Sequence, residues 1–206
     1  MKKLNILLLG KYVKKKTHKL SIYKFLKKTH NITFVDEFQK IKIKKYDLAI
    51  SYGYGKILKK KQIIAINCKI INLHIGYLPF ARGIYPLVWS LIFFKPIGFS
   101  IHLISDEKID DGPVIIKKKI HIKKNDNLKK IHFNCRKEIE DYFCKNFERI
   151  LNLKIKKSNN PKSNKNYYFS REISEKLMFK LPLKWHTSSD YLKKNSSNLK
   201  KIYREH

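Results

Sequence analysis

The sequence predicts an α/β fold, namely a doubly wound, mostly parallel Rossmann-like sheet with a short C-terminal extension. Short apolar runs alternate with amphipathic stretches in the first half of the 206-residue chain, which is typical of strands alternating with helices in a parallel sheet. A segment of Lys, Ser and Asn at residues 156–165 then interrupts this pattern. We therefore expect one main domain over residues 1–155, and a basic linker with an extension over residues 156–206.

Each expected element follows from the spacing of its apolar residues. Strands are expected at the short apolar or β-branched runs Leu4–Leu9, Ile32–Val35, Asp47–Ser51, Lys69–His74, Phe99–Ser105 and Pro113–Ile122. Helices are expected at the amphipathic stretches Thr17–Lys28, with Thr17 near the N-cap, Ile57–Ile66, Tyr85–Phe94 and Leu128–Leu153. The last two strands are expected to extend the sheet in an antiparallel or mixed arrangement. The polar end from about Asn195 is expected to fray.

The composition is strongly basic. The chain has 47 Lys and Arg against 16 Asp and Glu, which gives a formal net charge of +31 at pH 7. Such a charge suits a nucleic-acid or anionic-membrane partner. The lysines are spread along the whole chain, however, and heavy use of Lys, Ile and Asn, which all have AT-rich codons, explains the charge without a partner. We expect neither a nucleic acid nor a membrane to be the partner.

Cysteine usage and hydropathy narrow the class of protein further. The three cysteines form no Cys-x-x-Cys pattern, so we predict neither a disulfide framework nor a metal site. The apolar run that ends at Gly10 is too short for a signal peptide, and the run Ile84–Phe94 is too short to cross a bilayer. We therefore expect a cytoplasmic protein.

A polar pair lies on the expected strand Lys69–His74. Asn72 and His74 are two residues apart, so their side chains share one face near the carboxyl end of the strand, where ligands bind in open α/β sheets. Asp110 follows the next long strand and can reach the same crevice. An amide and an imidazole can stabilise charge on an acyl oxygen, while a carboxylate orients the imidazole and assists proton transfer. The three side chains therefore suit transfer of an acyl group to an amine.

Each residue also has a purely structural explanation. Alone, His74 is typical of a hydrogen-bonded residue at the core or its rim, and Asn72 and Asp110 are typical of strand-end or turn positions. His102 alternates with apolar neighbours and is expected to support the site. Arg82 either holds a substrate phosphate or is a solvated loop charge. The joint pattern favours the chemical interpretation, because its parts are far apart in the sequence.

The motif Asn72-Leu-His74, the strand Gly98-Phe-Ser-Ile-His102 and the distant Asp110 resemble the folate-dependent formyltransferase family. Members transfer the formyl group of 10-formyltetrahydrofolate to an amine. The resemblance is clear over about residues 47–122 and implies a formyltransferase catalytic domain in residues 1–155, with Asn72, His74 and Asp110 as catalytic residues. It also implies a homodimer by family analogy. The implied folate contacts are Tyr52, Gly53, Tyr54, Ile57 and Asp106.

Three branches of this family compete. The run from Asn72 to Gly83 is most similar to the sugar N-formyltransferases, which act on nucleotide-linked amino sugars, and it implies acceptor contacts from Tyr77, Arg82 and Gly83. Glycinamide ribonucleotide formyltransferases share the three catalytic residues but lack this loop, and they are the first alternative. Methionyl-tRNA formyltransferases carry a C-terminal barrel domain for which this chain has no room. A basic nucleic-acid-binding protein on this fold is the second alternative, although no RNA-binding aromatic motif is present.

Some positions depart from the family pattern. Asp111 stands where Gly, Ala or Thr is usual, Gly76 replaces a common Ser, and Lys117 replaces a common Gln. The extra carboxylate is expected either to raise the pKa of Asp110 through like-charge proximity or to point to solvent. These departures leave the identity of the acceptor open.

Overall fold

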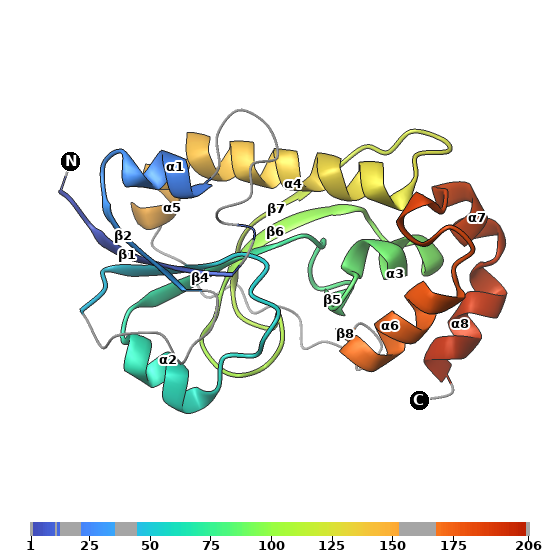
Figure 1. Cartoon of the computed structure of the whole chain (residues 1–206), viewed down its shortest axis with the longest axis horizontal. Helices are drawn as coiled ribbons and strands as arrows, with labels where there is room; N and C mark the ends of the chain where they lie inside the picture. The colour runs from blue at the N-terminus through green and yellow to red at the C-terminus, as the bar shows by residue number, and fades with distance from the viewer. Residues whose placement is uncertain (1, 11, 13–21, 36–44, 153–167, 205–206) are drawn as a thin grey trace.

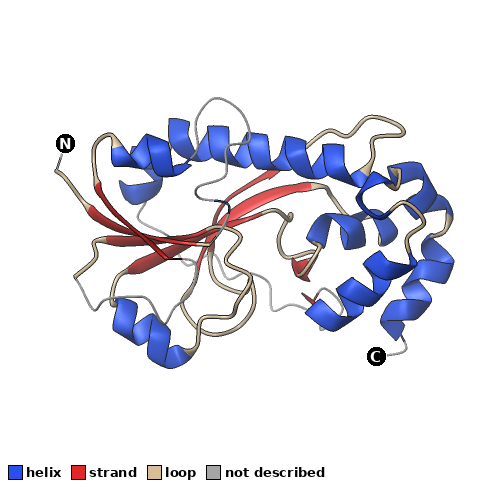
Figure 2. Cartoon of the chain, in the orientation of Figure 1, coloured by secondary structure: helices blue, strands red, loops and turns tan. Residues whose placement is uncertain are grey.

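The computed structural model describes residues 2–10, 12, 22–35, 45–152 and 168–204. The expected N-cap at Thr17 and the linker over residues 156–165 lie outside the described residues. The described residues form a central sheet with flanking helices, and a helical extension packs at one end of it (Figures 1 and 2).

Among the described residues, six strands form the main sheet in the order β2-β1-β3-β4-β6-β7. They are β1 (Asn5–Leu9), β2 (Asn31–Val35), β3 (Leu48–Ser51), β4 (Lys69–His74), β6 (Gly98–Leu103) and β7 (Val114–Lys119). Strands β1 to β4 are parallel, whereas β6 runs antiparallel to β4 and β7 runs antiparallel to β6. The predicted doubly wound, mostly parallel sheet with an antiparallel extension is therefore confirmed.

The sheet has a hydrophobic core on each face, because successive strand residues point to opposite sides. In β1, Ile6 and Leu8 belong to one core cluster, whereas Leu7 and Leu9 belong to the other. Helix α2 (Lys60–Ile66) covers the second face (Figure 1). The first face is covered by α1 (Ile22–Lys27), α4 (Leu128–Lys145) and α5 (Phe147–Asn152). Burial on both faces explains why the parallel strands are continuous apolar runs in the sequence.

Some helix boundaries differ from the sequence predictions. Helix α2 begins at Lys60 rather than Ile57, and its start is capped by the Gln62 side chain, which accepts the Lys59 N–H at 2.8 Å. The expected single helix over residues 128–153 is instead divided into α4 and α5 at Asn146. The Asn146 side chain donates to the Tyr142 carbonyl at 2.9 Å and so competes with the helical hydrogen bonds.

The C-terminal extension packs onto the domain through α3 (Pro86–Ile92), in which Pro86 occupies the first turn as predicted. Its short strand β8 (Tyr168–Phe169) pairs with β5 (Arg82–Gly83). The remaining elements of the extension are α6 (Arg171–Lys180), the 3₁₀ helix η4 (Lys184–His186), α7 (Ser189–Lys194) and α8 (Ser196–Arg204). The prediction that the chain frays from Asn195 was wrong, because Leu199 and Ile202 of α8 are buried against the core.

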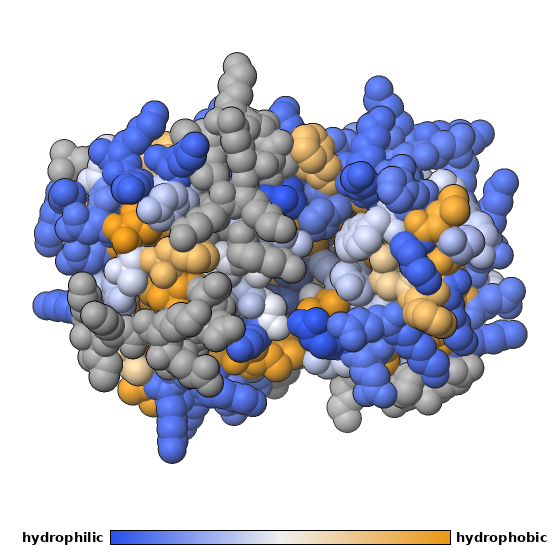
Figure 3. All heavy atoms as spheres, viewed as in Figure 1, coloured by the Kyte–Doolittle hydropathy of each residue, from blue (hydrophilic) through white to orange (hydrophobic). Residues whose placement is uncertain are grey.

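Hydrophilic side chains cover most of the described surface in the view of Figure 3, in keeping with the high net charge. Within the described ranges, none of the helices has both the length and the apolar character needed to cross a bilayer.

Candidate active site

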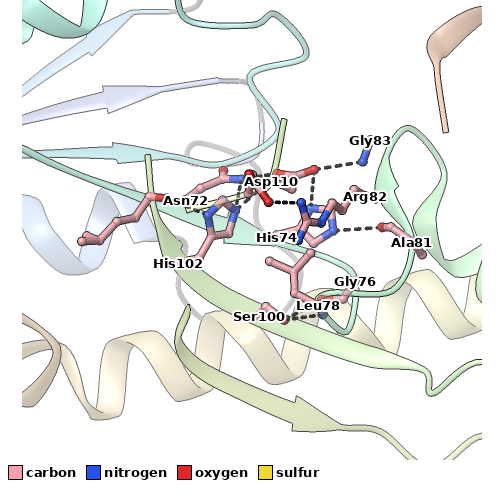
Figure 4. A network of polar contacts seen from close by, with 12 residues as sticks. Asn72, His74, Gly76, Leu78, Ala81, Arg82, Gly83, Ser100, His102 and Asp110 are labelled. Atoms are coloured by element: carbon pink, nitrogen blue, oxygen red, sulfur yellow. Dashed lines mark hydrogen bonds and ion pairs between the residues drawn. The ribbon is translucent and has the colours of Figure 1, made fainter. Parts of the chain in front are cut away.

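The candidate active site lies where β4 ends. Asn72 and His74 share one face of this strand, and the neighbouring antiparallel strand β6 places His102 opposite Asn72 and Ser100 opposite His74 (Figure 4). Asp110 comes from the loop between β6 and β7. The switch from parallel to antiparallel pairing at β4 therefore brings polar residues from two strands and one loop to the same edge of the sheet.

Asp110 is the centre of the polar network. Its Oδ1 accepts a hydrogen bond from Asn72 Nδ2 at 3.1 Å and lies 3.3 Å from His102 Nε2. Its Oδ2 accepts the Gly83 backbone N–H at 3.0 Å and lies 3.4 Å from His74 Nδ1. The carboxylate side chain is 12% exposed. The structure thus brings together Asn72, His74 and Asp110, the three residues predicted to be catalytic.

His102 fixes the orientation of the Asn72 amide. The Asp110 carboxylate can only accept, so Asn72 directs Nδ2 towards it, and the same Nδ2 lies 3.0 Å from His102 Nε2. His102 Nδ1 lies 2.8 Å from the Leu103 carbonyl oxygen. With a proton on Nδ1, His102 donates to Leu103 and accepts from Asn72 at Nε2; with a proton on Nε2, it donates to Asp110 Oδ1. This geometry gives His102 the supporting position that the sequence predicts.

Burial and neighbouring groups set the charge states of the pair. Burial lowers the pKa of His74 below its ordinary 6.5, and this outweighs the opposing effect of the Asp110 charge. Burial also acts to raise the pKa of Asp110, but His74, His102 and the Gly83 N–H together hold that pKa well below its usual range. At neutral pH the site therefore contains a neutral imidazole beside an ionised carboxylate.

Gly76 leaves the room that the His74 ring occupies. A Cβ atom at position 76 would lie 2.4 Å from His74 Nε2 and 3.0 Å from Pro86 Cβ. His74 Nε2 also lies 3.3 Å from the Ala81 carbonyl oxygen. The Gly at this position therefore leaves room for the His74 ring as it lies here.

Arg82 and Asp111 form an ion pair beside the network. Arg82 is only 2% exposed, and its Nε and Nη2 atoms have no hydrogen-bond partner among the described residues. Arg82 is therefore not a solvated loop charge. Neither expectation for Asp111 holds, because this carboxylate pairs with Arg82 and the pKa of Asp110 is lowered rather than raised. Two consecutive residues, Arg82 and Gly83, bind two consecutive carboxylates.

A cavity of about 650 Å³ opens over this network, and Asn72, His74, His102 and Asp110 all line it. The residues expected to contact folate also line it, namely Tyr52, Gly53, Tyr54, Ile57 and Asp106.

Of the three residues expected to contact the acceptor, only Gly83 is among the described residues that line the cavity. Arg82 is instead buried beside Asp111. The Tyr77 ring lies against β7, with Lys117 Nζ and Lys119 Nζ at 5.0 and 5.9 Å from its centroid. Acceptor contacts from Tyr77 and Arg82 therefore stay predictions.

Ser100 supports the site, although no role for it was predicted from the sequence. Its hydroxyl donates to the Gly76 carbonyl at 2.8 Å and accepts the Leu78 N–H at 3.0 Å, so it holds the turn that follows His74. The signal was present in the sequence, because Ser100 and His102 alternate on one strand and so share a face.

Residues 13–145 match the family model described as formyl transferase. The chain belongs to the formyl transferase family. A methionyl-tRNA formyltransferase of Prochlorococcus marinus is 29% identical to it over 182 residues, which cover 87% of this chain and 50% of that protein. A dTDP-4-amino-4,6-dideoxyglucose formyltransferase of Mycobacterium tuberculosis is 32% identical over 85 residues, which cover 41% of this chain and 35% of that protein. The formyl transferase chain thus spans half or less of the length of these curated relatives.

Solved structures show the same fold. The formyltransferase PseJ from Anoxybacillus kamchatkensis superposes on this formyl transferase with a TM-score of 0.74 and 28% identity, covering 91% of this chain and 97% of that one. PseJ was solved in complex with UDP-4,6-dideoxy-4-formamido-L-AltNAc and tetrahydrofolate. A methionyl-tRNA formyltransferase from Clostridium thermocellum shares the fold with a TM-score of 0.60 at 18% identity.

Proposed function

We propose that this formyl transferase moves the formyl group of 10-formyltetrahydrofolate to the amine of a nucleotide-linked amino sugar. The observation that carries the proposal is that Asn72 and His74 both contact the Asp110 carboxylate, and that all three residues line one cavity. The likeness to PseJ supports the sugar branch, because it extends over 97% of a chain whose complex holds a nucleotide-linked formamido sugar and tetrahydrofolate.

The cavity has the size and lining that a folate co-substrate needs. Its volume of about 650 Å³ falls within the range of small-molecule sites. The turn with Gly53 and Tyr54 offers backbone groups at its rim, and Ile57 presents an apolar side chain that is 45% exposed. When bound, the co-substrate supplies an activated formyl group.

Two side chains of the network act on the reacting groups. In the site as described, the two Asn72 amide N–H groups face Asp110 and His102; one of them leaves its partner and donates to the formyl oxygen, where negative charge develops. In the reacting complex the Asp110 carboxylate holds the Nδ1 proton of neutral His74, and Nε2 gives up its contact with the Ala81 carbonyl to accept a proton from the attacking amine. The amine nitrogen bonds to the formyl carbon as the bond from that carbon to the folate nitrogen breaks. His74 then returns the proton to the folate nitrogen.

An acceptor competition tests the proposal. UDP- and dTDP-linked amino sugars, glycinamide ribonucleotide and methionyl-tRNA are offered together with 10-formyltetrahydrofolate, and formylated products are identified by mass spectrometry. We expect a formylated nucleotide sugar with the wild type and none with the Asp110→Asn variant. Product from glycinamide ribonucleotide alone, or from methionyl-tRNA alone, would assign the chain to another branch. Folate binding without any product would overturn the acceptor class, and absence of folate binding would overturn the reaction.

A further inference from the structure

Four aromatic side chains form a continuous surface at the cavity. We call Tyr12, Tyr85, His132 and Trp185 the aromatic wall; each is partly buried and each lines the cavity. Neighbouring ring centroids lie 5.9 Å apart for Tyr12 and His132, 5.3 Å for His132 and Trp185, and 5.6 Å for Trp185 and Tyr85. The wall therefore joins the main domain to η4 of the C-terminal extension.

A second aromatic cluster shows what a purely structural cluster looks like in this chain. Trp89 is fully buried, stacks on Phe169 with centroids 4.5 Å apart, and donates its indole N–H to Ser174 at 2.9 Å. Neither Trp89 nor Phe169 is among the described residues that line the cavity. The aromatic wall differs, because its rings face the cavity that holds the catalytic residues.

The Tyr12 end of the wall is closely packed. The Arg136 guanidinium lies 4.5 Å from the Tyr12 ring centroid, and Arg136 is itself bound to Glu140 at 2.9 Å. Gly53 packs directly against Tyr12, since a Cβ at that position would lie 2.3 Å from the ring. The Tyr12 ring therefore has little freedom to move before a ligand binds, which lowers the entropic cost of binding.

Most of the wall comes from other elements than the expected folate contacts. Tyr85 immediately precedes Pro86, which approaches Gly76 beside the His74 ring. The expected folate contacts Ile57 and Asp106 come from the β3–α2 and β6–β7 loops instead. Tyr85, His132 and Trp185 thus lie on elements that the folate prediction does not use, whereas Tyr12 packs against Tyr52 and Gly53 of the expected folate contacts.

We infer that the aromatic wall binds the nucleoside base of the acceptor, with Trp185 as its stacking platform. This inference rests on the proposed function and extends it to the C-terminal extension. A base is planar and stacks on the face of an aromatic ring. The ring nitrogens of His132 and Trp185 can also form hydrogen bonds with the heteroatoms of the base. Glycinamide ribonucleotide carries no base, so the wall favours a nucleotide-linked acceptor over it.

Intrinsic tryptophan fluorescence tests this inference directly. The chain has two tryptophans, and Trp89 is fully buried, so a ligand in the cavity should quench the fluorescence of Trp185. UMP and dTMP are titrated into the wild type and into the Trp185→Phe and Trp185→Ala variants. We expect quenching by at least one nucleotide in the wild type and its loss in both variants.

For formyl transfer, Trp185→Ala should raise KM for the nucleotide sugar about tenfold with kcat nearly unchanged, as expected for lost stacking on one base. Phe179→Ala, which removes an aromatic ring that is 81% exposed, serves as the matched control and should change neither quantity.

The outcomes separate this inference from the proposed function. If UMP or dTMP quenches the wild type but not the Trp185 variants, binding of the base by the aromatic wall is supported, even if the acceptor panel yields no product. Turnover of a nucleotide sugar without such quenching, and with an unchanged KM in Trp185→Ala, overturns the wall while the proposed function stands. Quenching by 5-formyltetrahydrofolate or by a free amino sugar, but by neither nucleotide, would assign the wall to those ligands and overturn the inference.

Discussion

Asp110 and Glu140 are both carboxylates of low exposure that accept hydrogen bonds, yet their surroundings differ. Asp110 lines the cavity beside a neutral imidazole. Glu140, on α4, is 1% exposed and accepts the Tyr52 hydroxyl at 3.0 Å and Arg136 Nη2 at 2.9 Å behind the cavity. Burial, followed by the Glu140 charge, raises the pKa of Tyr52 well above its ordinary 10.0. A buried charge with perturbed neighbours therefore identifies an active site only where a substrate can reach it.

The largest expected effect is the loss of turnover in Asp110→Asn. The amide cannot hold the His74 Nδ1 proton as a carboxylate does, and it carries no charge to stabilise a protonated imidazole. We expect kcat/KM for formyl transfer to fall about 1000-fold, within the range of general acid–base contributions, in a variant that still folds but has a lowered thermal unfolding midpoint, because the ionised carboxylate accepts hydrogen bonds in the network. A variant that folds and retains near wild-type turnover would remove Asp110 from the mechanism.

Glu140→Gln should lower stability but not turnover. It leaves the Arg136 guanidinium, whose side chain is 12% exposed, without its buried counter-charge. We expect the free energy of unfolding to fall by about 3 kcal/mol in a denaturant titration, with kcat close to that of the wild type, because Glu140 contacts Arg136 and the expected folate contact Tyr52 but not the reacting groups. Unchanged stability together with a large loss of turnover would mean that both carboxylates serve the chemistry, and the distinction between them would fail.

Gly76→Ser tests the geometry around His74 at the end of β4. The new Cβ would lie 2.4 Å from His74 Nε2, so the imidazole must move. We expect kcat to fall about 100-fold, because misplacement of a catalytic group by about 1 Å has this order of effect. Ala65→Ser, at an exposed position of α2, adds the same hydroxyl as a control. Full activity of Gly76→Ser would show that the ring position seen here is not the reactive one.

Asp111→Ala tests the ion pair beside the polar network. Removing the carboxylate leaves the Arg82 side chain, which is 3% exposed, unpaired, whereas the Asp111 side chain itself is 28% exposed. We expect about 2 kcal/mol loss in unfolding free energy, less than for a fully buried pair because solvent reaches the carboxylate. The double variant Arg82→Met/Asp111→Ala should recover most of that loss. If the double variant is less stable than Asp111→Ala, then loss of the ion pair does not account for the destabilisation caused by removing Asp111.

The polar edge of the sheet at the end of β4 could be predicted from the sequence because it depends on local rules. Asn72 and His74 share a face by strand periodicity, and Asp110 follows the next long strand. The Arg82–Asp111 pair could not be predicted, since it depends on how two loops lie against each other. Nor could the place of Trp185, which reaches the cavity from beyond the linker. The buried face of α8 was missed because its apolar residues are few among many polar ones.

Other expectations from the sequence remain predictions. These are the homodimer, a cytoplasmic location and the division into residues 1–155 and 156–206. The described part of the extension packs directly on the main domain, because Phe169 stacks on Trp89 of α3 and β8 pairs with β5. Light scattering of the purified chain measures its oligomeric state.

The pH dependence of kcat/KM tests most directly whether a neutral His74, held by the Asp110 carboxylate, carries the proton. Because burial lowers the pKa of His74 below 6.5, activity should fall on the acid side with a midpoint below 6.5. The Asp110 charge raises the pKa of His74, so the residual activity of Asp110→Asn should fall at a still lower pH. An acid midpoint at or above 6.5, or one that Asp110→Asn leaves in place, would contradict the account.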